Sequence, residues 1–188
     1  MSEPVPIHAE GIFTMGVDGG IWESLIFEYL DKDRYYKNLL RDREGLLNEL
    51  RTVMENMQGF LDEETIKING EVVKARVIDV SLGFRGSFDR PYLEFYIYFK
   101  GNLRRGVNRY EDYYEEEVAE YDYEIVWLFP PGFRIIEYEF AGGEGSILGG
   151  GNILRLTVKK GLKVGSYESI TFEAPLNFNI FNALLNIK

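Results

Sequence analysis

The chain has 188 residues, a formal net charge of −10, no cysteine and one histidine. This composition excludes disulfides, thiol nucleophiles, thiolate metal sites and zinc sites that need several histidines of one chain. The length suits one folding unit, and the apolar share of 45% is enough to fill a sizeable core. The absence of cysteine is compatible with a reducing cytoplasm, while many charged residues and a single glutamine favour a thermophilic source.

The negative charge also bears on partners. Nucleic acids and anionic lipids are bound through basic patches, and the one short basic cluster, Arg104, Arg105 and Arg109, is followed at once by acidic residues. No apolar run is long enough to span a membrane, and the N-terminal residues lack the basic and apolar regions of an export signal. We therefore expect a cytoplasmic protein that binds neither nucleic acid nor membrane.

The first third of the chain is predicted to be helical after a flexible segment at 1–20. Within 21–60, apolar residues recur at spacings of three and four, which is typical of a helix with one buried stripe. Asp18 and the glycines after it can open a helix near 21–30, and Gly59 can end a longer helix within 33–58. The stripe includes Met54 and Met57 and is expected to pack against the rest of the same chain.

From Glu64 onward, apolar residues recur at every second position, which indicates strands. Asn69-Gly70 predicts a tight hairpin turn, and a shift of the apolar set near Val77 predicts a β-bulge. Strands are expected at 92–99 and 118–129, an irregular connection at 101–117, and a glycine-rich hairpin loop at 142–152. The last residues, 176–188, can add a strand or a short helix.

The predicted fold class is α+β, because the helices come first as a block and do not alternate with strands. An N-terminal segment of two helices (21–60) would pack on an antiparallel β-sandwich or barrel of about seven or eight strands formed by 63–188. The strand at 92–99 is apolar or aromatic on both faces. We expect the helices to cover its tyrosine-bearing face; the competing view is an exposed aromatic platform that binds a partner or ligand.

The most unusual stretch is acidic and rich in tyrosine, EDYYEEEVAEYDYE at 111–124. If a strand begins at Val118, the carboxylates of Glu120, Asp122 and Glu124 line one face about 6.5–7 Å apart. This pattern is compatible with a solvated strand face, with a surface that recognises a protein or a cation, or with a pair of catalytic carboxylates. No phosphate-binding or cofactor motif is found in a suitable context.

We therefore predict a non-enzymatic binding or protein-interaction module without cofactor or metal, whose partner is another protein or a second copy of the chain. The predicted contact residues are Tyr113, Tyr114, Glu120, Asp122, Glu124, Arg104 and Arg105. One alternative is a hydrolase or metal-dependent enzyme that uses Glu120, Asp122 and Glu124. Another is a carbohydrate-binding β-sandwich in which Tyr96, Tyr98 or Trp127 stacks on sugar rings.

Overall fold

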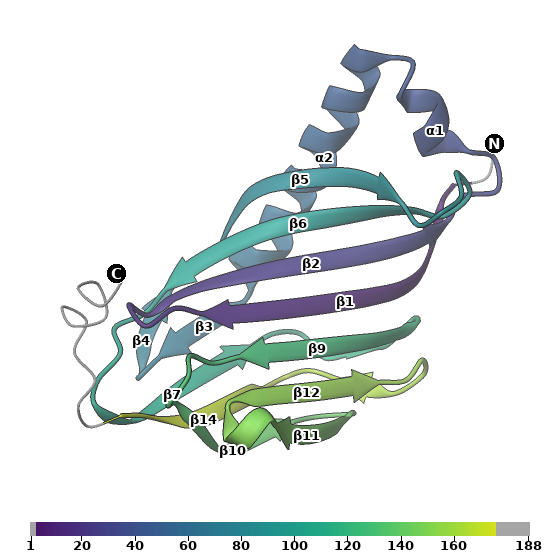
Figure 1. Cartoon of the computed structure of the whole chain (residues 1–188). Helices are drawn as coiled ribbons and strands as arrows, with labels where there is room; N and C mark the ends of the chain where they lie inside the picture. Colours follow the sequence, from purple (N-terminus) through teal and green to yellow (C-terminus); the bar gives the residue numbers. More distant parts are fainter. Residues whose placement is uncertain (1–2, 176–188) are drawn as a thin grey trace.

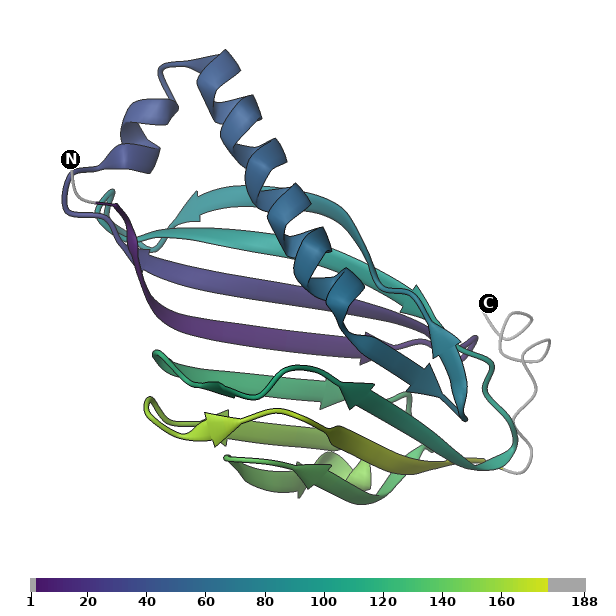
Figure 2. The same cartoon turned by 180° about the vertical axis from the view of Figure 1, so that it is seen from behind.

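The computed structural model describes residues 3–175, and within them it contains fourteen strands, two α-helices and one short 3-10 helix. Figure 1 and Figure 2 show the chain from opposite sides. The elements are β1 (Val5–Met15), β2 (Gly20–Leu30), α1 (Tyr35–Leu39), α2 (Arg43–Glu63), β3 (Thr65–Ile68), β4 (Glu71–Val73), β5 (Arg76–Phe84), β6 (Pro91–Lys100), β7 (Gly106–Tyr113), β8 (Glu117–Val118), β9 (Asp122–Leu128), β10 (Arg134–Phe140), β11 (Glu144–Leu148), η1 (Gly149–Gly151), β12 (Ile153–Val158), β13 (Lys163–Val164) and β14 (Glu168–Ala174).

Most strands belong to two sheets. The larger sheet has seven strands in the order β11-β12-β9-β1-β2-β6-β5, the second has five in the order β10-β14-β7-β3-β4, and β8 pairs with β13 in a short ribbon. All ladders are antiparallel except β1 with β9, which run parallel. The predicted purely antiparallel sheet of seven or eight strands is therefore wrong in both strand number and direction.

The two sheets pack face to face around an aromatic core. Tyr110 of β7 lies 4.6 Å from Trp127 of β9, measured between ring centroids, and Phe172 of β14 lies 4.8 Å from Phe129. The turn at Pro130–Gly132 carries the chain from the larger sheet to the second one. Because Tyr110, Trp127 and Phe172 are all at most 1% exposed, this contact joins the sheets into one core.

The N-terminal segment is the main correction to the predicted fold. Residues expected to be flexible form β1, and the helix expected near 21–30 is strand β2, which pairs with β1 from Ile21 to Leu30. The turn between them is stabilised by the carboxylate of Asp18, which accepts a hydrogen bond from the Gly20 amide at 3.1 Å. Both strands lie near the centre of the larger sheet, so the helices follow a β-hairpin and do not form an N-terminal block.

The helical stripe of α2 packs within the chain, as predicted. Leu50, Val53, Met54 and Met57 lie against the core, and α2 crosses the larger sheet on the same side as the second sheet (Figure 2). This side carries Leu93, Phe95, Ile97 and Phe99 of β6, which are all buried. The prediction that the helices cover the tyrosine-bearing face of β6 is therefore wrong, because they cover the opposite face.

The tyrosine-bearing face is the outer face of the larger sheet, which Figure 1 views from the front. Trp22 of β2 is 50% exposed and lies 4.9 Å from the Tyr98 ring at a tilt of 47°. Arg85 lies over the Tyr92 ring, and Ser24 donates a hydrogen bond to Glu94 at 2.6 Å. This face thus mixes aromatic rings with paired polar groups.

Several local predictions are confirmed. Ile68 pairs with Glu71 across Asn69-Gly70, whose φ angles are both positive, as a two-residue hairpin turn requires. The register of β5 against β6 shifts between Val77 and Asp79, where the bulge is predicted.

The prediction of an irregular connection at 101–117 is wrong, because this segment contains β7 in the middle of the five-stranded sheet.

The strand or short helix expected at 176–188 falls on residues outside the described part of the chain. Among those that are described, neither helix is both long and apolar enough to cross a membrane.

Candidate functional site

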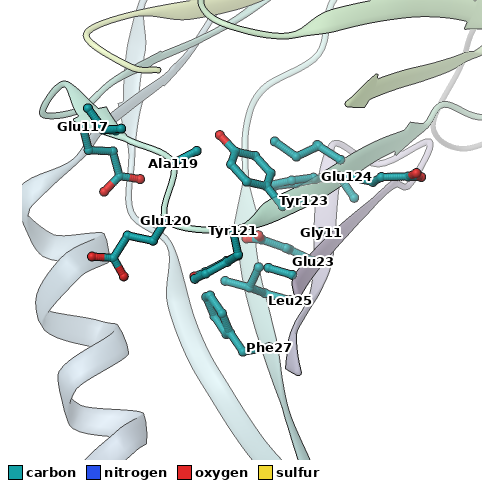
Figure 3. A pocket seen from close by; sticks show the side chains of 14 residues that line it. Gly11, Glu23, Leu25, Phe27, Glu117, Ala119, Glu120, Tyr121, Tyr123 and Glu124 are labelled. Atoms are coloured by element: carbon teal, nitrogen blue, oxygen red, sulfur yellow. The ribbon is translucent and has the colours of Figure 1, made fainter. Parts of the chain in front are cut away.

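A cavity of about 260 Å³ opens on the inner face of the larger sheet, and we call it the acid pocket (Figure 3). Strands β1 and β2 form one wall, and residues 117–125 form the other. The β1–β2 wall consists of Ala9, Gly11, Phe13, Glu23, Leu25 and Phe27. The second wall belongs to the acidic, tyrosine-rich stretch that the sequence marks as unusual, so part of that stretch does contribute to a concave site.

Glu23 is the exception on its wall. Inward-facing positions of β2 alternate with outward-facing ones, and the inward series is Ile21, Glu23, Leu25 and Phe27. Glu23 pairs across the sheet with Phe13 on one side and Ile97 on the other, so an acid takes the place of an apolar residue in this row. Its side chain faces the pocket (Figure 3).

The Glu23 carboxyl is buried without a hydrogen-bond partner. The residue is 9% exposed, and no hydrogen bond or ion pair with another residue of 3–175 involves its side chain. Burial, together with the negative charges of Glu64, Asp112 and Glu168, raises the pKa of Glu23 to about 8. At neutral pH the carboxyl is therefore largely protonated and presents an O–H group to the pocket.

Three further acids lie behind Glu23, each from a different element. They are Glu64 at the end of α2, Asp112 on β7 and Glu168 on β14. Burial is the main cause that raises their pKa values, which are about 7 for Glu64, about 6 for Asp112 and about 8 for Glu168. Tyr110 donates to Asp112 Oδ2 at 3.2 Å and lies 3.5 Å from Glu168 Oε1, while Tyr114 donates to Glu168 Oε2 at 3.4 Å. The second oxygen of Asp112 is buried and has no hydrogen-bond partner within the described chain. Negative potential is thus concentrated behind the pocket.

Aromatic side chains line the rest of the cavity. Phe13 stacks on the core residue Trp127, with 4.2 Å between ring centroids and 5° between ring planes, so this wall is supported from behind. Tyr121 and Tyr123 stand opposite, beside Glu23 (Figure 3), and burial raises the pKa of Tyr121 to about 12. A side chain added at Gly11 would point toward the Glu23 carboxyl, because its Cβ would lie 3.8 Å from Oε1. Glycine at this position keeps the cavity open.

The outer wall is held by the short ribbon of β8 and β13. Val118 pairs with Lys163, the Ala119 amide donates to the Leu162 carbonyl at 2.9 Å, and the Gly161 amide donates to the Ala119 carbonyl at 2.8 Å. Ala119 is buried beside Val158 and Val164. These contacts fix the chain before Tyr121, so the pocket is largely pre-formed.

The three carboxylates predicted to line one strand face do not lie on one continuous strand. The strand expected from Val118 is interrupted, since β8 ends at Val118 and β9 begins at Asp122. Asp122 accepts from the Lys159 ammonium at 2.8 Å and from the Lys160 amide at 2.9 Å. Glu124 points away from the cavity and lies 3.7 Å from Arg155, whereas Glu120 is exposed beside the pocket (Figure 3).

The other predicted contact residues are spread over the second sheet. Tyr113 ends β7, packs 4.9 Å from Tyr167 and bonds to Glu111, while Tyr114 reaches Glu168 behind the acid pocket. Arg104, which donates to Asn69 at 3.2 Å, and the exposed Arg105 precede β7, so a strand roughly 26 Å long separates them from Tyr113. The predicted set is therefore not one site.

Two alternative chemistries can be compared with this geometry. Within residues 3–175, no three His, Asp or Glu side chains converge to hold a metal ion. Trp127 is 1% exposed and offers no ring face to a sugar, while Tyr98 meets its exposed neighbour Trp22 at a tilt and does not form a flat platform with it.

The candidate site residue that sequence reasoning missed is Glu23. The comparisons with protein-family models and with curated proteins give no match for this sequence. The acid pocket itself is thus the basis for a functional proposal.

Proposed function

We propose that the protein is a non-enzymatic binding module that takes a small amphipathic molecule into the acid pocket. The observation that carries this proposal is Glu23, a carboxyl that is nine-tenths buried, has no partner within 3–175, and faces an aromatic cavity. A buried polar group without a partner costs free energy, and a ligand that pairs with it recovers that cost. Mostly apolar pockets with a few oriented polar groups are typical small-molecule sites.

Other expectations from the sequence accompany this proposal. A cytoplasmic location, the lack of nucleic-acid binding, and a protein partner or second copy bound through 111–124 stay predictions. The acidic overall charge supports the expected lack of nucleic-acid binding, because contacts to phosphates need basic groups.

The test uses the uncharged fluorescent probe N-phenylnaphthylamine with the full-length protein. We expect a saturable rise in probe fluorescence at a stoichiometry of one, because the cavity removes the probe from water. The variant Gly11→Val fills the cavity next to Glu23 and should lower probe affinity at least about tenfold. Thr14→Val changes an exposed position of the same strand and should leave binding unchanged. No saturable binding, or equal binding to both variants, would refute the proposal.

A second candidate is a hydrolase that uses Glu23 as a general acid. The high pKa of Glu23 favours it, because a catalytic acid must hold its proton at neutral pH. The exposed Glu117 or Glu120 would then be the second carboxyl group of the site. Turnover of chromogenic glycosides that disappears in Glu23→Gln would favour this candidate over simple binding.

A further inference from the structure

A second hollow lies next to the acid pocket, beneath α2. This hollow, which we call the apolar groove, has a volume of about 250 Å³ and shares Phe27 and Tyr121 with the acid pocket. Val53, Met57 and Phe60 of α2 form its roof, and Leu93 and Phe95 of β6 form its floor. None of the residues that line it is charged. The two cavities together thus offer an acidic end and an apolar end.

The acidic end has no positive group of its own. Three glutamates, Glu23, Glu117 and Glu120, lie at the acid pocket, and its lining includes no Lys, Arg or His. Glu124 is paired with Arg155, but Glu23 is buried and unpaired among the described residues. The rings of Phe13, Phe27, Tyr121 and Tyr123 surround the same space, and aromatic faces attract cations. A positively charged group is therefore the complement of this end.

We propose that the ligand is a cationic amphiphile, an organic ammonium ion with an apolar chain, whose ammonium group pairs with the Glu23 carboxylate and whose chain passes Phe27 and Tyr121 into the apolar groove. Glu23 releases its proton to solvent when the ammonium group binds, because the positive charge favours the ionised form of the carboxyl. This inference rests on the function proposed above and names its ligand class. Phe27 is four residues beyond Glu23 on β2, and Tyr29 is six residues beyond it. The distance along the strand from Glu23 to Phe27 is therefore roughly 13 Å, at about 3.3 Å per strand residue, so the apolar chain needs about eight carbons or more to reach the apolar groove.

The apolar groove also accounts for an exposed apolar residue. Phe60 of α2 is 63% exposed although it belongs to the helix face that meets the sheet. A chain lying in the groove would cover part of its ring, which would recover hydrophobic free energy. Tyr121 lines both cavities and lies near Phe27 (Figure 3).

The experiment is competition against bound N-phenylnaphthylamine by three ligands with the same chain: octylammonium, octanol and octanoate. Octylammonium should displace the probe at a concentration at least about tenfold lower than octanol, and octanoate should be the weakest. Glu23→Gln should abolish the preference of ammonium over alcohol. The matched control Glu10→Gln removes one charge from the outer face of the neighbouring strand and should preserve it, which separates pairing in the pocket from general attraction to an acidic protein.

The chain end is tested with a second pair of variants on α2. Asn56 lines the apolar groove, whereas Glu55 beside it is exposed and does not. Asn56→Phe should weaken octylammonium binding severalfold but leave butylammonium unchanged, and Glu55→Phe should affect neither. Circular dichroism confirms that each variant is folded.

The outcomes distinguish the two proposals. If the probe binds and Gly11→Val blocks it, but octanol competes as well as octylammonium, the pocket binds ligands and the cationic ligand class is refuted. An ammonium preference that survives in Glu23→Gln would also overturn the inference. If the probe does not bind at all, the proposed function itself fails.

Discussion

At the scale of single residues, Glu23 is costly to the fold at high pH. Its pKa is about 8 in the folded protein against an ordinary value of 4.5. Because the folded pKa is raised, the folded state holds the proton more tightly than the unfolded state. The stability that comes from the neutral carboxyl is fully present below about pH 4.5 and is lost as the pH rises through about 8.

We therefore predict that Glu23→Gln stabilises the protein progressively as the pH rises from about 4.5 to about 8. At about pH 5 the variant and the parent should unfold at similar denaturant concentrations, since both present a neutral side chain. At about pH 8.5 the variant should be more stable by roughly 2 kcal/mol or more, at about 1.4 kcal/mol per pH unit between the two pKa values. Denaturant unfolding at both pH values measures this.

The control for this prediction is Glu10→Gln, which should change stability little at either pH because it lies on the outer face of β1. If Glu23→Gln is destabilising by the same amount at both pH values, Glu23 is ionised and has a partner in the folded state. The electrostatic account of the acid pocket would then be wrong.

At the scale of elements, Gln58 is a polar anchor between α2 and β5. Gln58 donates from Nε2 to the Ala75 carbonyl at 3.2 Å and accepts from the Val77 amide at 3.0 Å. The Ala75 carbonyl and the Val77 amide both precede the bulge of β5, where the register against β6 shifts. A bulge leaves backbone groups without partners in the strand ladder. The side chain thus joins the helix to an edge strand.

Replacing this anchor should loosen the helix. Gln58→Ala leaves two backbone groups without their partner and should cost about 1–3 kcal/mol of unfolding free energy. Hydrogen exchange should rise in α2 and at the start of β5. Glu55→Ala, an exposed change in the same helix, should have an effect within about 0.5 kcal/mol. Equal effects of the two variants would show that apolar packing alone holds α2.

Elements also show what the sequence could predict. The hairpin at Asn69-Gly70, the bulge near Val77 and the strand β6 follow from local patterns, and all three are present. Residues 20–30 are ambiguous, because Trp22, Leu25 and Tyr29 match helical spacing while Ile21, Leu25 and Phe27 alternate. The strand prevails because its outer residues also find partners, as Trp22 does on Tyr98. Local periodicity cannot show such contacts.

The same limit applies to the site. The stretch at 111–124 was correctly singled out as unusual, and Tyr121 and Tyr123 do line the acid pocket. Glu23 was not singled out, because the helix expected near 21–30 did not place its side chain in the core. The acids behind it come from α2, β7 and β14, so only the three-dimensional fold brings them near it. A single acid in an alternating apolar row is the signal that could have found Glu23.

At the scale of the whole molecule, the parallel pairing of β1 with β9 joins distant parts of the chain. His8 donates a hydrogen bond from Nδ1 to the Asp122 carbonyl at 2.8 Å, across a separation of 114 residues, and Phe13 stacks on Trp127. Without β1, the strands β11, β12 and β9 have no ladder with β2, β6 and β5 in the larger sheet. Closing so long a loop lowers the entropy of the chain before the contacts between β1 and β9 can form and offset that loss.

We predict that this pairing forms late in folding. In a Trp22→Phe background, Trp127 is the one tryptophan of the chain, and its fluorescence reports the contact with Phe13. Refolding followed by this signal should take milliseconds to seconds, as is usual for folds rich in non-local strand pairs. Pulsed hydrogen exchange should protect α2 amides, whose bonds are local, before those of β1 and β9. The β1–β2 hairpin amides serve as an internal control, because that hairpin is also local and should precede β9. Protection of β9 together with α2 would contradict this order and would mean that the sheet closes before the helix is stable.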